Sequence, residues 1–203
     1  MPDARTHDVI TVATGAALAP LTYSYLDGPL VLGHAAAMAG TLWIVGAHLL
    51  SGVLFSPDLD LDSAIDDRWG LLYWIWRPYM WALPHRHFWS HSLLFAPLLR
   101  LAYFYAVVSG LLFSWVWLLA RLGVVVPDYH VQLFDSLRGW LQANPDVTLA
   151  VLIGFVTGST AHTLADWLVT NGKRFLSIFG VRITRDYRNH DDDIHRRRKR
   201  RYA

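Results

Sequence analysis

The chain has 203 residues, of which 54% are hydrophobic and 17% charged, and its formal net charge is +2. It contains no cysteine, which excludes disulfides and thiolate metal sites, so a transition-metal site would have to use histidine and carboxylate ligands. It also contains no glutamate, so that every side-chain carboxylate belongs to an aspartate. The length suits one domain.

Four apolar stretches are long enough to cross a bilayer, which takes about 20 residues. They run from Val9 to Leu26, from Leu30 to Phe55, from Leu93 to Ala120 and from Val147 to Thr170. We therefore predict an all-α fold, an integral membrane bundle of about four transmembrane helices. The alternative is a water-soluble bundle whose helices are buried on all sides.

A tryptophan-rich segment follows the second apolar stretch. Five of the ten tryptophans lie between Trp69 and Trp89. Tryptophan collects at membrane–water interfaces because its ring is apolar while its N–H needs a partner. We predict that the segment from Trp69 to Trp81 lies along the membrane surface. Packing in a protein core is the alternative.

The last part of the chain differs in composition. Eleven of the eighteen lysines and arginines lie from Lys173 onward. We therefore divide the chain into a helical membrane domain, residues 1–172, and a polar, basic tail, residues 173–203. Such a tail is usually solvated, and it could also bind anionic lipid headgroups. Nothing else in the chain resembles a nucleic-acid-binding fold, so we expect the lipid bilayer and no nucleic acid as a partner.

Four spans would place both termini on one side of the membrane, together with residues 56–92. That side holds the basic tail and most of the other basic residues outside the spans, whereas the opposite side holds Arg121 and Arg138. Because basic loops mark the cytoplasmic side, we expect a multi-pass protein of the cell (inner) membrane with both termini in the cytoplasm.

The same topology gathers polar residues at the cytoplasmic end of the bundle. His162 and Asp166 are four residues apart and share a face of the fourth helix, as a metal-binding pair or simply a hydrogen-bonded one. Each of the other three helices has a histidine or an aspartate just outside this end. The full set is His7, Asp58, Asp60, His85, His91, His162 and Asp166.

Imidazole and carboxylate together suit zinc, and also manganese or iron. We expect a divalent metal ion, zinc in the first place, with one or two ions per chain. Two histidines within the spans, His34 and His48, are more often interior residues with hydrogen-bond partners than ligands. We keep His48 as a candidate for a residue that supports the metal ligands without binding the metal itself, because ionisable groups inside a membrane are often functional.

Three histidines occur in PHRHFWSHS, residues 84 to 92. His87 and His91 would share a face if one helix covered both, whereas His85 could join His91 at one centre only from a preceding loop. Ser90 is a suitable N-cap and would start the third helix at His91. We therefore favour His85 and His91 as ligands, and Arg86 as a group that binds an anionic substrate oxygen.

The motifs RTHD, SPDLD, HRxxxSH and HTLADW occur in this order within the first 170 residues. In these motifs the chain resembles a family of metal-binding membrane proteins, domain of unknown function 2227, which is similar to predicted membrane-bound, metal-dependent hydrolases. The resemblance implies ligand roles for the seven residues of the set above, with Asp8 as a further candidate.

We predict metal-dependent hydrolysis of a phosphoester or lipid-like substrate at the cytoplasmic face, by a water molecule that the metal activates. One alternative is a metal-binding membrane protein without catalysis, either a sensor or a transport component. The other is a membrane scaffold whose basic tail recruits partners and whose histidines are structural.

Overall fold

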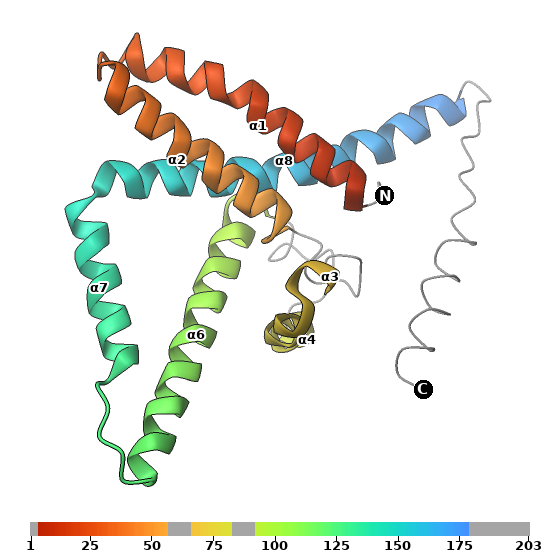
Figure 1. Cartoon of the computed structure of the whole chain (residues 1–203). Coiled ribbons are helices and arrows are strands. Elements are labelled where there is room, and N and C mark those ends of the chain that lie inside the picture. The colour runs from red at the N-terminus through yellow and green to blue at the C-terminus, as the bar shows by residue number, and fades with distance from the viewer. Residues whose placement is uncertain (1–3, 57–65, 83–91, 179–203) are drawn as a thin grey trace. The chain divides into compact units, whose positions relative to one another are not determined.

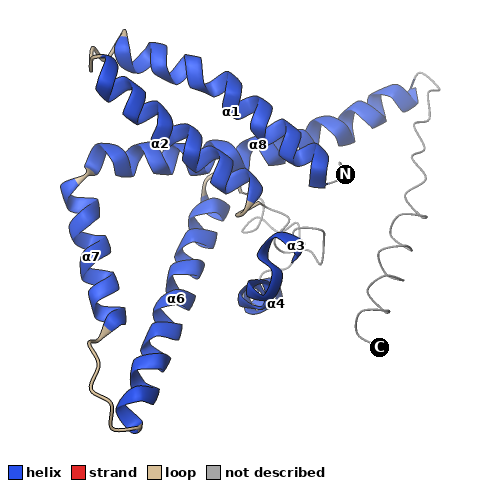
Figure 2. Ribbon diagram, viewed as in Figure 1, coloured by secondary structure: helices blue, strands red, loops and turns tan. Residues whose placement is uncertain are grey.

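The structure is a computed structural model that describes residues 4–56, 66–82 and 92–178, and these residues form helices joined by turns, without a strand among them (Figures 1 and 2). By their contacts, the residues divide into one unit of residues 2–166 and a second of Met1 with residues 167–203. The elements in chain order are α1 Ala4–Asp27, α2 His34–Val53, α3 Asp66–Trp69, the 3-10 helix η2 Gly70–Trp76, α4 Arg77–Ala82, α6 Phe95–Arg121, α7 Tyr129–Ala143 and α8 Pro145–Ile178.

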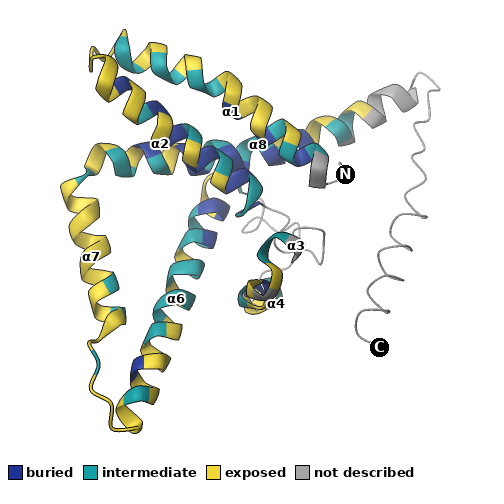
Figure 3. Cartoon of the chain, in the orientation of Figure 1, coloured by how far each residue is buried: buried dark blue, intermediate teal, exposed yellow. Residues whose placement is uncertain are grey.

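Four of these helices contain segments long and apolar enough to cross a membrane: Thr6–Asp27, His34–Val53, Phe95–Arg121 and Pro145–Val169. The predicted all-α fold with four such helices is therefore confirmed. The soluble alternative requires helices buried on all sides, but at most 39% of any of these segments is buried. Figure 3 shows buried positions where α1, α2, α8 and the start of α6 meet, and exposed ones along α7 and the far part of α6.

Helices α1 and α2 form an antiparallel hairpin with close backbone contact. Near the start of α1, the side chain of Thr11 lies where a Cβ on Gly52 would stand, and near its end a Cβ on Gly40 would be 2.9 Å from Leu26. Both glycines are on α2, and they admit the side chains of α1 because they have none of their own. Small residues allow this kind of approach between helices in membranes.

Helix α8 crosses α2 and touches its backbone at two glycines, Gly154 and Gly158. A Cβ on Gly154 would overlap the carbonyl oxygen of Ile44 and lie 2.7 Å from the Cβ of Ala47. A Cβ on Gly158 would overlap the carbonyl oxygen of His48. The two glycines are four residues apart on one face of α8, the spacing of close helix crossings in membranes. One turn beyond this crossing, His162 of α8 lies next to Ser56, just after the end of α2.

The tryptophan-rich segment is divided between core and surface. Phe55, just after α2, makes edge-to-face contacts with Trp69 and Trp76, with ring centroids 5.7 and 5.6 Å apart. Trp76 is fully buried, whereas Trp74 and Trp81 are 70% and 90% exposed. The core alternative therefore holds for one side of the segment, and the exposed side retains the character expected of an interface.

One local feature was not predicted, and one expectation needs correction. Between the third and fourth apolar stretches, α7 occupies most of residues 121–146, because its apolar residues recur at helical spacing and its polar residues fall on the opposite face. We expected the third helix to begin at His91, but α6 begins at Phe95. There the hydroxyl of Ser92 accepts a hydrogen bond from the backbone N–H of Phe95 at 3.2 Å, which satisfies one of the first N–H groups of this helix. Ser90, the expected N-cap, lies outside the described residues.

Candidate metal centre

Helices α1 and α8 bring three of the expected ligands together. His7 lies in the first turns of α1 and is 3% exposed, and His162 on α8 is 1% exposed. Asp166 follows His162 by four residues and is partly buried. All three stand close to the ends of the membrane-length segments, since these begin at Thr6 and end at Val169.

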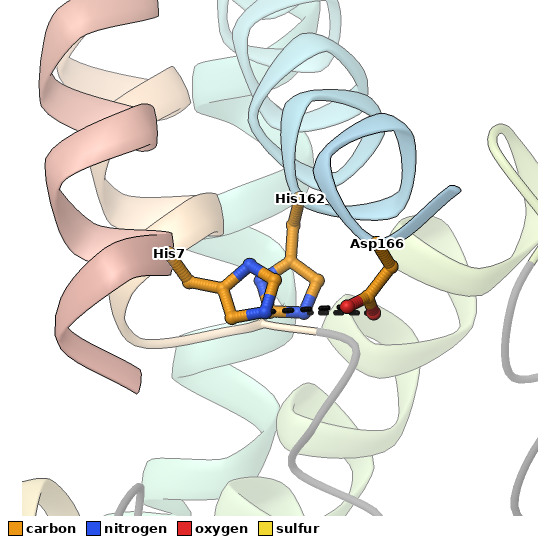
Figure 4. A group of neighbouring side chains, drawn as sticks. All are labelled: His7, His162 and Asp166. Carbon is orange, nitrogen blue, oxygen red and sulfur yellow. Dashed lines mark ion pairs between the residues drawn. The ribbon is translucent and has the colours of Figure 1, made fainter. Parts of the chain in front are cut away.

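The three side chains converge on one point (Figure 4). His7 Nε2 lies 3.4 Å from Asp166 Oδ1, and His162 Nε2 lies 3.9 Å from Asp166 Oδ2. The two imidazoles are stacked, with ring centroids 3.7 Å apart and planes inclined by 15°. One nitrogen from each histidine and one carboxylate oxygen lie within 4.8 Å of one another. Among the described residues this is the one group of three or more such side chains that could hold a metal ion.

The geometry and chemistry of these residues fit a divalent ion. In a tetrahedral site with metal–ligand bonds of about 2.0–2.1 Å, ligand atoms are about 3.3–3.5 Å apart. The 3.4 Å between His7 Nε2 and Asp166 Oδ1 matches this spacing, whereas the stacked rings would have to turn for both histidines to bind one ion. Neither ring nitrogen of His7 makes a hydrogen bond to a described residue, nor does Asp166 Oδ1, although all three atoms are buried. Buried polar atoms normally have partners, and a shared cation would supply one here.

The remaining nitrogen of His162 faces a polar group. Its Nδ1 lies 3.3 Å from the hydroxyl oxygen of Ser56, a buried residue three positions after the end of α2. If Nδ1 carries the proton and donates it to this hydroxyl, Nε2 is left as the nitrogen that would bind a metal ion. Metal-binding histidines usually have such a partner, which sets both the tautomer and the orientation of the ring.

The other expected site residues cannot be placed. Three of the seven expected ligands, His7, His162 and Asp166, are brought together. The others lie outside the described residues, as do His87 and the expected substrate-binding residue Arg86. These four ligands are Asp58, Asp60, His85 and His91.

Asp8, the additional candidate, pairs with an arginine. One of its oxygens, Oδ2, lies 2.6 Å from Nη2 of Arg68 in α3. The other, Oδ1, is buried without a hydrogen-bond partner among the described residues. Asp8 therefore stands beside the cluster and contributes at least one oxygen to an ion pair.

The two histidines within the spans have hydrogen-bond partners, as expected. His48 Nε2 lies 3.0 Å from the hydroxyl of Thr14 and 3.1 Å from the carbonyl oxygen of Thr11, and its Nδ1 lies 3.1 Å from the hydroxyl of Thr157. His48 thus joins α1, α2 and α8. His34, at the start of α2, lies 2.8 Å from the hydroxyl of Tyr23 through Nδ1.

Sequence reasoning did not identify Ser56 or Arg100. Arg100 is 1% exposed and donates hydrogen bonds to the carbonyl oxygen of Phe55 and to the hydroxyl of Ser159. A signal for Arg100 was present, because it is the one charge inside the third apolar stretch and charges at such positions are often functional. Nothing in the local sequence distinguishes Ser56.

Comparison with known proteins gives one match. The model of a family described as uncharacterized metal-binding protein (DUF2227) matches residues 2–176. No curated protein and no solved structure matches the chain. The matched span includes all three residues of the cluster as well as the four expected ligands outside the described residues.

Proposed function

Since the chain belongs to the DUF2227 family of uncharacterized metal-binding proteins, we propose that it is a membrane-embedded, metal-dependent hydrolase of a phosphoester or lipid-like substrate. The observation that carries this proposal is the buried cluster of His7, His162 and Asp166. Catalytic zinc sites commonly use three protein ligands and leave a fourth position for water or substrate. The four further expected ligands would suit a second ion, and paired metals typically assist hydrolysis.

Within this proposal the three residues of the cluster, and with them Ser56 and Arg86, each have a defined task. A divalent ion, when bound, supplies Lewis acidity and makes water an effective nucleophile at neutral pH. His7 and His162 contribute neutral nitrogen donors, and Asp166 contributes the negative charge of the cluster. Ser56 holds the ring of His162 in place. Arg86 is the residue we propose for binding an anionic oxygen of the substrate.

The proposed setting is the cytoplasmic face of the cell membrane. The cluster stands near the ends of two segments long enough to span a bilayer, one beginning at Thr6 and the other ending at Val169, where a lipid-like substrate could reach it from the interface. The basic residues near this end of the helices support a cytoplasmic orientation. We propose zinc as the metal, with manganese or iron as alternatives that the same ligands would accept.

One observation favours the transport alternative. Polar contacts also occur within the membrane-length segments, since His48 joins Thr11 and Thr14 of α1 to Thr157 of α8. A transporter needs polar groups along its path through the membrane, and intramembrane histidines often serve such paths. If the chain binds metal without turnover, His48 is the first residue to test for a role in transport.

The test is a turnover assay on the purified, metal-loaded chain in detergent. Bis(4-nitrophenyl) phosphate, 4-nitrophenyl phosphate and 4-nitrophenyl butyrate represent phosphodiester, phosphomonoester and carboxylic ester substrates. We expect hydrolysis of at least one, loss of activity with a chelator, recovery with zinc, and no activity in Asp166→Asn. Full metal occupancy with no turnover, extended to a broad set of phospholipids, would favour the binding-only alternative.

A further inference from the structure

The C-terminal end of α2 is held by side chains from other helices. The last carbonyl groups of a helix have no partner within it and need one from elsewhere. Here Val53 and Leu54 accept hydrogen bonds from Arg68 Nη1 at 2.5 Å and Trp69 Nε1 at 3.0 Å. Just after the helix, Phe55 accepts one from Arg100 Nη1, also at 2.5 Å. Three successive carbonyl groups thus accept hydrogen bonds from side chains of α3 and α6.

Each of the two arginines also reaches a helix that carries a metal ligand. The second guanidinium nitrogen of Arg68 binds Asp8, the residue after His7 on α1. The second guanidinium nitrogen of Arg100 lies 3.0 Å from the hydroxyl of Ser159, which precedes His162 on α8 by three residues. The planar guanidinium group can bind two partners at a set angle and spacing, which a lysine ammonium cannot reproduce.

The carbonyl group that Arg100 binds lies next in the chain to the residue that faces His162. Phe55, whose carbonyl oxygen is bound by Arg100, is followed by Ser56, whose hydroxyl faces His162 Nδ1. Arg100 also donates through Nε to the carbonyl oxygen of Ala96 one turn earlier on α6. The buried guanidinium therefore sets the backbone position of Ser56 against both α6 and α8.

We infer that Arg100 and Arg68 are positioning residues for the metal centre, which they hold through the end of α2. Arg100 orients His162 by way of Ser56 and Ser159, and Arg68 places His7 by way of Asp8. This inference rests on metal binding at the cluster, and it is independent of whether the chain hydrolyses any substrate.

The sign of the effect separates positioning from simple electrostatics. A cation close to a metal dication repels it, so that electrostatics alone would make metal binding tighter when the charge of Arg100 is removed. Positioning predicts the opposite, weaker binding, even though a repulsive charge has gone. Positioning also predicts weaker binding in Arg100→Lys, which keeps the charge and loses the two-armed geometry, whereas electrostatics predicts no change there.

The experiment titrates the purified, metal-free chain with Zn²⁺ against a competing chelator, and with Co²⁺ to record its visible absorption spectrum. The variants are Arg100→Lys, Arg100→Gln and Arg68→Lys. The matched controls are Arg121→Lys and Arg121→Gln at the far end of α6, where the guanidinium lies over the ring of Trp117 at 5.2 Å. We expect about 10–100-fold weaker Zn²⁺ binding and a changed Co²⁺ spectrum in the first group, as for the loss of other ligand-orienting partners. The controls should behave as the wild type does.

Unchanged Zn²⁺ affinity and an unchanged Co²⁺ spectrum in Arg100→Lys, or tighter binding in Arg100→Gln, would overturn the inference for Arg100. The same unchanged result in Arg68→Lys would overturn it for Arg68. If the Arg100 variants do not fold, Ser56→Ala takes their place, because it removes only the hydroxyl that faces His162. Weaker Zn²⁺ binding in folded Ser56→Ala supports the positioning of His162, and wild-type binding contradicts it.

Discussion

The stacked imidazoles of His7 and His162 come from opposite ends of the sequence and are both almost fully buried. His7 Nε2 and Asp166 Oδ1 are buried without a hydrogen-bond partner among the described residues. Buried polar atoms normally have partners, and a shared cation would supply one. At the scale of single residues, the three side chains are therefore a candidate ligand set for a metal ion.

Removing one ligand should abolish tight metal binding. We expect Zn²⁺ affinity to fall by more than about 100-fold in His7→Ala, His162→Ala and Asp166→Asn. Loss of a residue that only orients a ligand already lowers metal affinity by about 10–100-fold, and loss of a ligand itself should cost more. The matched control is His34→Ala, whose ring binds Tyr23 at the turn between α1 and α2. Metal content after dialysis, measured by mass spectrometry, checks the prediction. Equal zinc in His162→Ala and His34→Ala would contradict it.

The histidines of residues 84–92 give a second prediction at this scale. His85→Ala and His91→Ala should lose metal, and His87→Ala should retain it. Because α6 begins at Phe95, this expectation rests on the family resemblance and no longer on the faces of a helix. Metal stoichiometry of His85→Ala and His87→Ala, measured side by side, decides between the two assignments. Loss in His87→Ala with retention in His85→Ala would show that the assignment is wrong.

At the scale of elements, the crossing of α2 and α8 determines where His162 lies. Gly154 and Gly158 allow the two backbones to touch, and the hydroxyl of Ser51 donates a hydrogen bond to the carbonyl oxygen of Phe155 at 2.6 Å. The site begins one turn beyond this contact. A larger residue at the crossing would therefore move the ligands as well as destabilise the bundle.

Gly158→Ala should show both effects. A Cβ at this position overlaps the carbonyl oxygen of His48, and overpacking of this kind costs about 1–3 kcal/mol of stability. Gly46→Ala is the matched control on α2, because nothing lies within 4 Å of a Cβ there, and it should be neutral or slightly stabilising. Thermal unfolding in detergent and Zn²⁺ titration provide the measurements. A Gly158→Ala variant as stable and as tightly metal-binding as Gly46→Ala would refute the role of the crossing.

At the scale of the whole molecule, the topology explains why the site forms at one end of the helices. The start of α1, the end of α2, the start of α6 and the middle of α8 are joined by the contacts of Asp8 (through Arg68), Phe55, Arg100 and His162. These polar groups lie on one side of a membrane only if each of the four apolar helices crosses it.

The absence of cysteine allows a direct test of that topology. Single cysteines introduced at Gly28, Trp69 and Asp128 can be labelled in intact cells with a reagent that does not cross the membrane. We expect labelling at Gly28 and Asp128 and none at Trp69, because basic residues mark the cytoplasmic side. Labelling of all three positions would contradict four crossings. Labelling at Trp69 alone would show that the orientation is the opposite of the proposed one.

The helical fold could be predicted from the sequence because length and apolar composition are local properties. Four apolar stretches led to four helices with nearly the same limits, and the spacing of His162 and Asp166 placed them on one face of α8. The order of the spans then indicated the common end at which His7 joins them. These features follow from helix geometry and from the thickness of a bilayer.

The tertiary structure decided which particular groups meet, because contacts between helices depend on side chains far apart in the sequence. The stacking of His7 on His162, the hydroxyl of Ser56 behind His162 and the buried guanidinium of Arg100 have no local signature of their partners. Trp76 became a core residue and Trp81 stayed exposed for the same reason, since both sit in one aromatic segment and only packing against Phe55 separates them. Composition therefore determined that this chain forms membrane-length helices with polar ends, and the close approach of α1, α2 and α8 at their glycines determined that His7, His162 and Asp166 meet in a group that could hold a metal ion.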